Sequence, residues 1–159
     1  MNDDFLDLLC ALQEAGAEFV VIGAHALAAN GIVRATVGLD VLVRPTPANA
    51  QAVYAGLRAF GAPLATHGVT VADLSRTGTV YQMGLPPRRI DITTAIEGVT
   101  YEQASAKPVI REVGGMQVPF LRLAEVLRSK RAAGRAKDLA DLELVREAGF
   151  DVEALLAAD

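Results

Sequence analysis

The spacing of apolar residues predicts alternating helices and strands in the N-terminal part of the chain. After the acidic start Asn2-Asp3-Asp4, apolar residues recur at helical spacing up to Gly16, which predicts a first helix capped by those polar side chains. The segments that follow predict a buried strand, a short helix, a second strand and a helix begun by Thr46-Pro47; they are residues 18–23, 24–31, 37–43 and 46–61.

Two hairpins and a helical segment are predicted for the rest of the chain. Residues 79–96 alternate around a turn at 85–88, and residues 109–121 alternate around Gly114-Gly115. From Leu121 to about Glu147 the pattern is helical and charged, whereas residues 62–77 give no clear pattern. We therefore expect an α/β (α+β) fold, a small mixed sheet flanked by helices. It would be one domain over 1–159, with a core of about 5–120 and a C-terminal helical segment of about 121–159.

Composition favours a globular protein of the cytoplasm. The chain has 159 residues, 52% of them apolar, which is enough for one core, and its net charge of −4 argues against broad binding of nucleic acid. Cys10 is the only cysteine, so an intrachain disulfide is excluded and a reducing compartment is expected. No apolar run reaches the roughly 18 residues of a membrane span, and the acidic start lacks the basic region of a signal peptide.

Two aspartates interrupt strands that are otherwise apolar. Asp40 lies within GLDVLV and Asp91 within RIDIT, and desolvating an ion costs several kcal/mol unless a partner compensates for it. A nearby arginine or an exposed strand face would explain either residue alone. If the two strands are neighbours, the two carboxylates can instead share a divalent cation through the oxygen ligands that Mg²⁺ prefers.

Two further features suit phosphate. At Gly23-Ala24 a strand enters a short helix, whose free N–H groups favour anions, although a tight structural turn explains the same residues. The predicted long helix carries the basic residues Lys130, Arg131, Arg135 and Lys137, with 131 and 135 one turn apart. These residues either approach a triphosphate or form a solvated face in which Lys137 pairs with Asp141. His25 is expected to be structural.

Taken together, these motifs resemble the nucleotidyltransferase-fold (polymerase-β-like) superfamily, and in particular small bacterial proteins near the AbiEii-type toxin nucleotidyltransferases. The resemblance runs over roughly residues 5–147. It rests on the turn at Gly23, the Arg34-x-Thr36 that leads into the second strand, Asp40 in that strand, Asp91 in a later one, and the C-terminal series of Lys130, Arg135-x-Lys137-Asp138 and Asp141.

The resemblance implies a site and an activity. Asp40 and Asp91 would be the catalytic metal ligands for Mg²⁺ or Mn²⁺, and a nucleoside triphosphate would donate its nucleoside monophosphate to a hydroxyl group of a protein, an RNA or a small molecule. The implied nucleotide-binding residues are Gly23, Ala24, Arg34, Thr36, Lys130, Arg135 and Lys137, although Arg34 could equally cap a strand end.

The sequence departs from the family pattern at two positions. Gly38 stands where the first aspartate of an Asp-x-Asp pair is expected, and Ala24 stands where glycine or serine is usual. Two cations about 3.5–4 Å apart normally hold the attacking and leaving oxygens, so losing a shared ligand impairs that arrangement. Two interpretations stay open: an unusual transferase, or an inactive nucleotide-binding or toxin–antitoxin-type interaction module with a protein partner.

Overall fold

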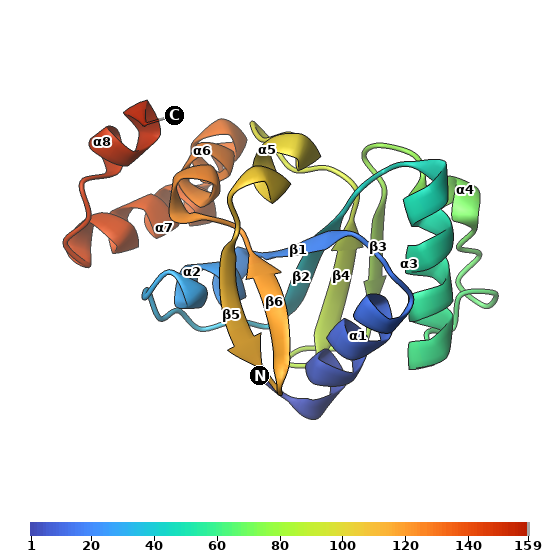
Figure 1. The fold of residues 1–159 in the computed structure, drawn as a ribbon. Helices are drawn as coiled ribbons and strands as arrows, with labels where there is room; N and C mark the ends of the chain where they lie inside the picture. The colour runs from blue at the N-terminus through green and yellow to red at the C-terminus, as the bar shows by residue number, and fades with distance from the viewer. Residues whose placement is uncertain (159) are drawn as a thin grey trace.

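A six-stranded mixed sheet with helices on both faces forms the protein, as the computed structural model of residues 1–158 shows (Figure 1). This confirms the predicted fold class. The strands are β1 (Phe19–Ile22), β2 (Gly38–Val43), β3 (Val80–Met83), β4 (Arg89–Thr93), β5 (Val109–Val113) and β6 (Met116–Phe120). The helices are α1 (Asp3–Glu14), α2 (Gly23–Ala29), α3 (Pro47–Phe60), α4 (Val71–Leu74), α5 (Tyr101–Ala106), α6 (Leu123–Ala133), α7 (Ala136–Glu147) and α8 (Val152–Ala157).

The strand order is β3-β4-β2-β1-β6-β5, so that both predicted hairpins lie at the edges of the sheet. β3 pairs with β4 and β5 with β6 in antiparallel fashion, as the hairpin turns require. In the centre, β2 is antiparallel to β1 and parallel to β4. The parallel pair brings β2 and β4, which are far apart in sequence, into direct register.

The helices α1, α3 and α4 cover one face of the sheet (Figure 1). Leu8, Leu9 and Leu12 of α1 are completely buried there, as the helical spacing predicts. They pack with alternate residues of the strands, including Val41 of β2 and Ile92 of β4. Because side chains of a strand alternate between faces, the residues next to these, Asp40 and Asp91, must point to the other face.

The opposite face is covered only in part. The helices α2, α5, α6, α7 and α8 form a second core with Val20 of β1 and Leu42 at the end of β2. In front of β2, β3 and β4, residues of this face line a cleft instead; they include Asp40, Val80 and Arg89. The uncovered half of the sheet therefore supplies the floor of the cleft, and the helical layer supplies one of its walls.

The helices differ in part from the sequence prediction. The predicted long helix from Leu121 is broken at Gly134, whose left-handed conformation (φ 63°) ends α6 before α7 begins. Arg131 and Arg135 therefore do not share a helix face. The helix α5, of 6 residues, was not predicted, because so few turns give little periodicity. The helix α8, also of 6 residues, lies within the helical segment expected over about 121–159. The unassigned segment 62–77 contains the short helix α4.

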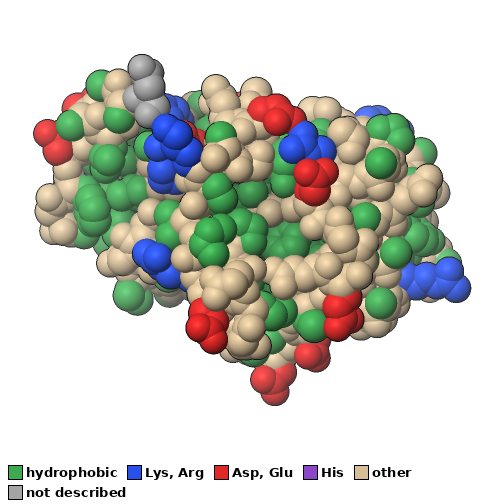
Figure 2. Space-filling view, in the orientation of Figure 1, with side chains coloured by type: hydrophobic (Ala, Val, Ile, Leu, Met, Phe, Trp, Pro, Cys, Tyr) green, Lys and Arg blue, Asp and Glu red, His purple; other side chains and the backbone are tan. Residues whose placement is uncertain are grey.

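Charged side chains are scattered over the face of the molecule shown in Figure 2, where Lys and Arg lie in small groups among Asp and Glu. None of the helices within residues 1–158 combines the length and the apolar character needed to cross a bilayer.

Candidate active site

Asp40 and Asp91 lie side by side on neighbouring strands. The parallel register of β2 and β4 pairs Asp40 directly with Asp91, and neighbouring strands are about 4.8 Å apart. Both acids therefore lie in strands, as predicted, and the two strands are neighbours, which is the condition for a shared cation. Asp40 is partly buried, and the side chain of Asp91 is 15% exposed.

The two carboxylates are poorly compensated. Burial, followed by the charge of Asp91 and a side-chain hydrogen bond with it, raises the pKa of Asp40 to about 6. Arg89 and Lys130 act in the opposite direction and lower that pKa, but their effect is smaller. The buried oxygen Oδ1 of Asp91 lacks a hydrogen-bond partner, although Nε of Arg89 lies 3.4 Å away. An additional positive charge between these groups would therefore be stabilised.

The turn at Gly23 lies directly against Asp40. A β-carbon at position 23 would be 2.5 Å from Oδ2 of Asp40, and the backbone there has φ +70°, which side chains rarely adopt. Both facts require glycine. The next residue, Ala24, is buried in the first turn of α2, and Gly23 and Ala24 line the cleft together with Asp40.

The position of Gly38 in β2 has no room for a side chain. In register, Gly38 lies opposite Arg89. A β-carbon at position 38 would lie 2.8 Å from the carbonyl carbon of Arg89 and closer still to its oxygen, whereas real β-carbons essentially never approach other atoms within 3.0 Å. The place of a first aspartate is therefore taken up by the backbone of β4, which the sequence alone could not reveal.

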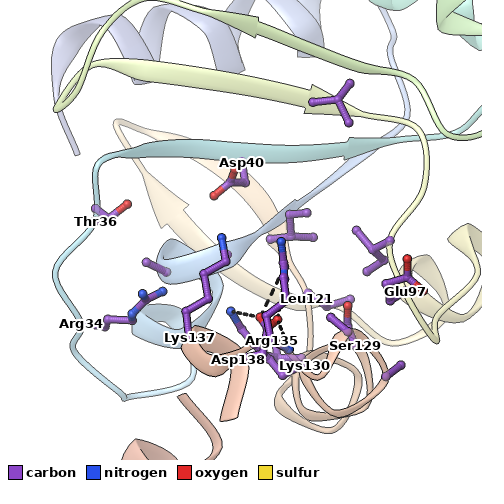
Figure 3. Close-up of a pocket in the computed structure, with 18 of the residues that line it drawn as sticks. Arg34, Thr36, Asp40, Glu97, Leu121, Ser129, Lys130, Arg135, Lys137 and Asp138 are labelled. Carbon is purple, nitrogen blue, oxygen red and sulfur yellow. Dashed lines mark hydrogen bonds and ion pairs between the residues drawn. The ribbon is translucent and has the colours of Figure 1, made fainter. Parts of the chain in front are cut away.

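A cleft of about 880 Å³ opens in front of the two strands. Figure 3 shows Asp40 projecting from β2 into this space, toward which the side chain of Lys137 extends from α7. Five cationic side chains line the cleft against three acidic ones, although the whole chain carries a net charge of −4. They are Arg34, Arg89, Lys130, Arg135 and Lys137, against Asp40, Glu97 and Asp138. The cleft thus has the charge balance to accept an anion.

Three of the predicted basic residues are engaged in ion pairs with α7. Nζ of Lys130 lies 2.6 Å from Oδ2 of Asp141 and 3.6 Å from Oδ1 of Asp138. Nε of Arg34 lies 3.0 Å from the other oxygen of Asp141, and Nε of Arg135 lies 2.7 Å from Oδ2 of Asp138. Asp141 therefore pairs with Lys130 and Arg34. It does not pair with Lys137, the partner given to it by the interpretation of a solvated face. This network of ion pairs joins α6, α7 and the segment before β2. Its two acids, Asp138 and Asp141, are buried, with exposures of only 1% and 4%.

Two other predicted residues have contrasting surroundings. The hydroxyl of Thr36 donates a hydrogen bond to the carbonyl oxygen of Gly38 and accepts one from its N–H group, so it shapes the start of β2 at the cleft wall. Lys137 is exposed, and within residues 1–158 it belongs to none of the ion pairs described above. Among the predicted cleft residues, Lys137 is thus the cation most available to a ligand.

His25 lies outside the cleft lining. Its ring packs edge-on against Phe5, with 5.8 Å between the ring centroids, and burial lowers its pKa. This agrees with the structural role expected for it, although its Nε2 atom is buried without a hydrogen-bond partner.

The donor set fits one divalent cation better than two. Within residues 1–158 there is no group of three or more His, Cys, Asp or Glu side chains that could hold a metal ion. The pair Asp40 and Asp91 offers only oxygen ligands, which Mg²⁺ and Mn²⁺ accept, and one of these oxygens is buried and unsatisfied. Substrate phosphate oxygens or water would have to complete the coordination.

Arg89 is the main residue of the cleft that the sequence analysis did not single out. It lies two positions before Asp91 on β4, so strand alternation places both on the same face. That alternation was the available signal. Glu97 and Ser129 also line the cleft, but they come from a loop and from α6, and no pattern in the sequence connects them with β2.

Comparison with known proteins supports the fold. A crystal structure of a protein from Thermotoga maritima, described as a putative nucleotidyltransferase, superposes with a TM-score of 0.55 over 93% of this chain and 94% of its own, at 13% sequence identity. At that identity the match establishes a nucleotidyltransferase-like fold and no more. No protein-family model matches the sequence, and no curated protein matches it with significance.

Proposed function

We propose that the cleft binds a nucleoside triphosphate together with Mg²⁺ or Mn²⁺ and transfers the nucleoside monophosphate to a hydroxyl group. The observation that carries the proposal is the pairing of two undercompensated carboxylates: Asp40 lines a cleft that is otherwise rich in cations, and Asp91 lies beside it on the neighbouring strand. Two adjacent acids favour a metal cation, and the surrounding basic side chains favour the phosphates that accompany it.

Within this proposal, each cleft residue has a distinct task. Asp40 and Asp91 hold the cation, which when bound would polarise the phosphate and neutralise the charge that develops there. The backbone at Gly23 and Ala24 faces the phosphates, while Lys137 approaches them with a charge that is not already paired. Arg34, Lys130 and Arg135 contribute less charge, because Asp138 and Asp141 already neutralise much of theirs. Thr36 acts by shaping the start of β2.

The transfer itself is a substitution at the α-phosphorus. The acceptor oxygen forms the new bond, the bond to the bridging oxygen of pyrophosphate breaks, pyrophosphate leaves, and the hydroxyl proton passes to a carboxylate of the pair. The acceptor belongs to a protein, an RNA or a small molecule. Since β-strands of the core and helices of the 121–159 segment line the same cleft, we also propose that the chain acts as one domain.

A second function is favoured by the closed position at Gly38. Because the backbone of Arg89 excludes a side chain there, the chain has two acidic ligands where the resembling families have three. The second candidate is therefore a catalytically inactive module that binds nucleotide, or a toxin–antitoxin-type interaction module that acts on a protein partner.

Calorimetry on the purified protein tests nucleotide binding. We expect ATP, GTP, CTP or UTP to bind in the presence of Mg²⁺, and Asp40→Asn to weaken that Mg²⁺-dependent binding at least about tenfold. Asp73→Asn changes a partly exposed aspartate outside the cleft; it serves as the matched control and should bind as the unaltered protein does. Absence of binding for all four nucleotides would contradict the proposal.

An assay with α-labelled nucleotide separates the two candidate functions. Label transferred to protein, RNA or a small acceptor by the unaltered protein, and lost in Asp40→Asn, supports the transferase. Nucleotide binding with no transfer in any fraction supports the inactive module.

A further inference from the structure

We propose that the guanidinium of Arg89 acts as a fixed positive charge for the triphosphate, in the place that a second metal cation would otherwise occupy. The inference rests on the proposed function, since it concerns the same nucleotide. It assigns to Arg89 a binding role that goes beyond neutralising Asp91, and it makes the cleft a site for one metal cation.

The position of Arg89 is the first support. In the parallel register Arg89 lies opposite Gly38, one step along the same face from the pair Asp40 and Asp91. Its side chain lines the cleft and is 34% exposed, so the guanidinium reaches the space in which a ligand would lie. Its Nε is 3.4 Å from Oδ1 of Asp91, close enough to fix the side chain but without the geometry of a hydrogen bond.

The absence of a side chain at position 38 is the second support. The same residue, Arg89, both excludes a carboxylate there with its backbone and brings a guanidinium to that part of the face. Without the third carboxylate, a second divalent cation has too few acidic ligands. Arginine carries a permanent positive charge and several N–H donors arranged to bind phosphate oxygens. Unlike a metal cation, it needs no carboxylate ligands to hold that charge beside the phosphates.

The charge balance is the third support. In a two-metal site, two divalent cations against three carboxylates leave a net charge of +1. One divalent cation and one guanidinium against Asp40 and Asp91 leave the same net charge. The electrostatic environment offered to a triphosphate is therefore preserved, although its distribution is different.

Two binding measurements that do not depend on activity test the role of Arg89. The first is binding of Mn²⁺ alone, followed by electron paramagnetic resonance, and the second is binding of inorganic tripolyphosphate in EDTA, followed by calorimetry. In Arg89→Gln we expect tripolyphosphate to bind about tenfold or more weakly, the size of one charge-assisted contact. Mn²⁺ should bind more tightly, by up to about tenfold, because a competing positive charge beside Asp91 has been removed.

The opposite signs distinguish this role from a structural one. If Arg89 only stabilised the fold, Arg89→Gln would weaken both ligands, and that result would overturn the inference. Arg88→Gln is the matched control, because Arg88 is the adjacent residue and is exposed and paired with Asp4, 2.9 Å away; it should change neither affinity. Arg89→Lys, which keeps the charge, should retain most of the tripolyphosphate affinity.

The number of cations bound gives a further check. With a non-hydrolysable nucleotide present, we expect one Mn²⁺ per chain, and two per chain would contradict the inference. If the unaltered protein binds neither nucleotide nor tripolyphosphate, the proposed function itself fails. If it binds both and Arg89→Gln behaves like the unaltered protein, only the role of Arg89 is lost.

Discussion

The carboxylate of Asp40 fills the space that a side chain at Gly23 would need. Oδ2 of Asp40 lies 2.5 Å from the position of a β-carbon at residue 23. Gly23 begins α2 directly after β1, and Ile22, the last residue of β1, pairs with Asp40 on the adjacent strand β2. The turn and the acid are therefore one structural unit, and a change at either residue must affect the other.

Gly23→Ala should destabilise the protein and displace Asp40. The left-handed backbone (φ +70°) costs an alanine about 1 kcal/mol, and the clash with Asp40 adds to that, for a total of about 2–3 kcal/mol. Gly31→Ala is the control, because Gly31 has φ +89° but nothing within 4 Å of the added carbon. Urea denaturation should show the larger loss for Gly23→Ala; equal losses would mean that the contact with Asp40 is unimportant.

Asp40 should make the stability of the protein depend on pH. Its pKa is about 6 in the folded state, because of burial and the charge of Asp91, and 3.8 is the ordinary value. Between those values the folded state binds more protons than the unfolded state, so stability falls as pH rises and stays low above 6. Asp40→Asn should therefore be the more stable protein at pH 8, by on the order of 2 kcal/mol, and no more stable at pH 3.

The control for that pH dependence is Asp73→Asn. Hydrogen bonds from the backbone and side chain of Thr70 lower the pKa of Asp73, with a smaller contribution from Arg76. Its stabilising contribution is present at neutral pH and is lost as pH falls, so Asp73→Asn should be the less stable protein at pH 8. Urea denaturation at several pH values measures both variants, and a change of the same sign in both would contradict the explanation given for Asp40.

The elements that the sequence predicts well are those whose signals are local. The alternation of Ile90, Asp91 and Ile92 defines a strand by itself, and Thr46 with Pro47 marks the start of α3, where the Thr46 side chain accepts the N–H of Asn49. Burial of a carboxylate is also a local signal, because apolar neighbours on both sides imply desolvation. The candidate acids, Asp40 and Asp91, could therefore be named before the structure.

The features that were not predictable depend on contacts across the sheet or between helices. That Gly38 faces the backbone of Arg89 follows from the register of β2 and β4, which the sequence does not specify. The ion pairs of Asp141 with Lys130 and Arg34 need the break at Gly134, which turns α7 back along α6. Lys137 and Asp141 are four residues apart within α7, but the carboxylate of Asp141 is engaged by Lys130 and Arg34 instead.

Gly38→Asp should fail to create a second metal site. The backbone of Arg89 occupies the position of the new side chain, so β2 and β4 must separate before any carboxylate can enter. We expect a loss of about 1–3 kcal/mol in unfolding free energy and no additional Mn²⁺ bound. Gly38→Ala is the control, since it adds the β-carbon without charge and should lose a similar amount of stability. A stable Gly38→Asp that binds a second cation would show that the strands can adjust.

Lys130→Met should destabilise the protein through the acids it leaves behind. Lys130 is 17% exposed and lies between Asp138 and Asp141, which are 2% and 6% exposed in their side chains. Removing one partner from buried charges costs about 3 kcal/mol, because Arg135 and Arg34 then compensate them only in part. Arg131→Met is the control: its pair with Glu153 is 58% and 65% exposed, so its loss should cost less than about 0.5 kcal/mol in the same urea titration. Similar small losses in both variants would mean that water reaches Asp138 and Asp141, and that Lys130 is as available to phosphate as Lys137.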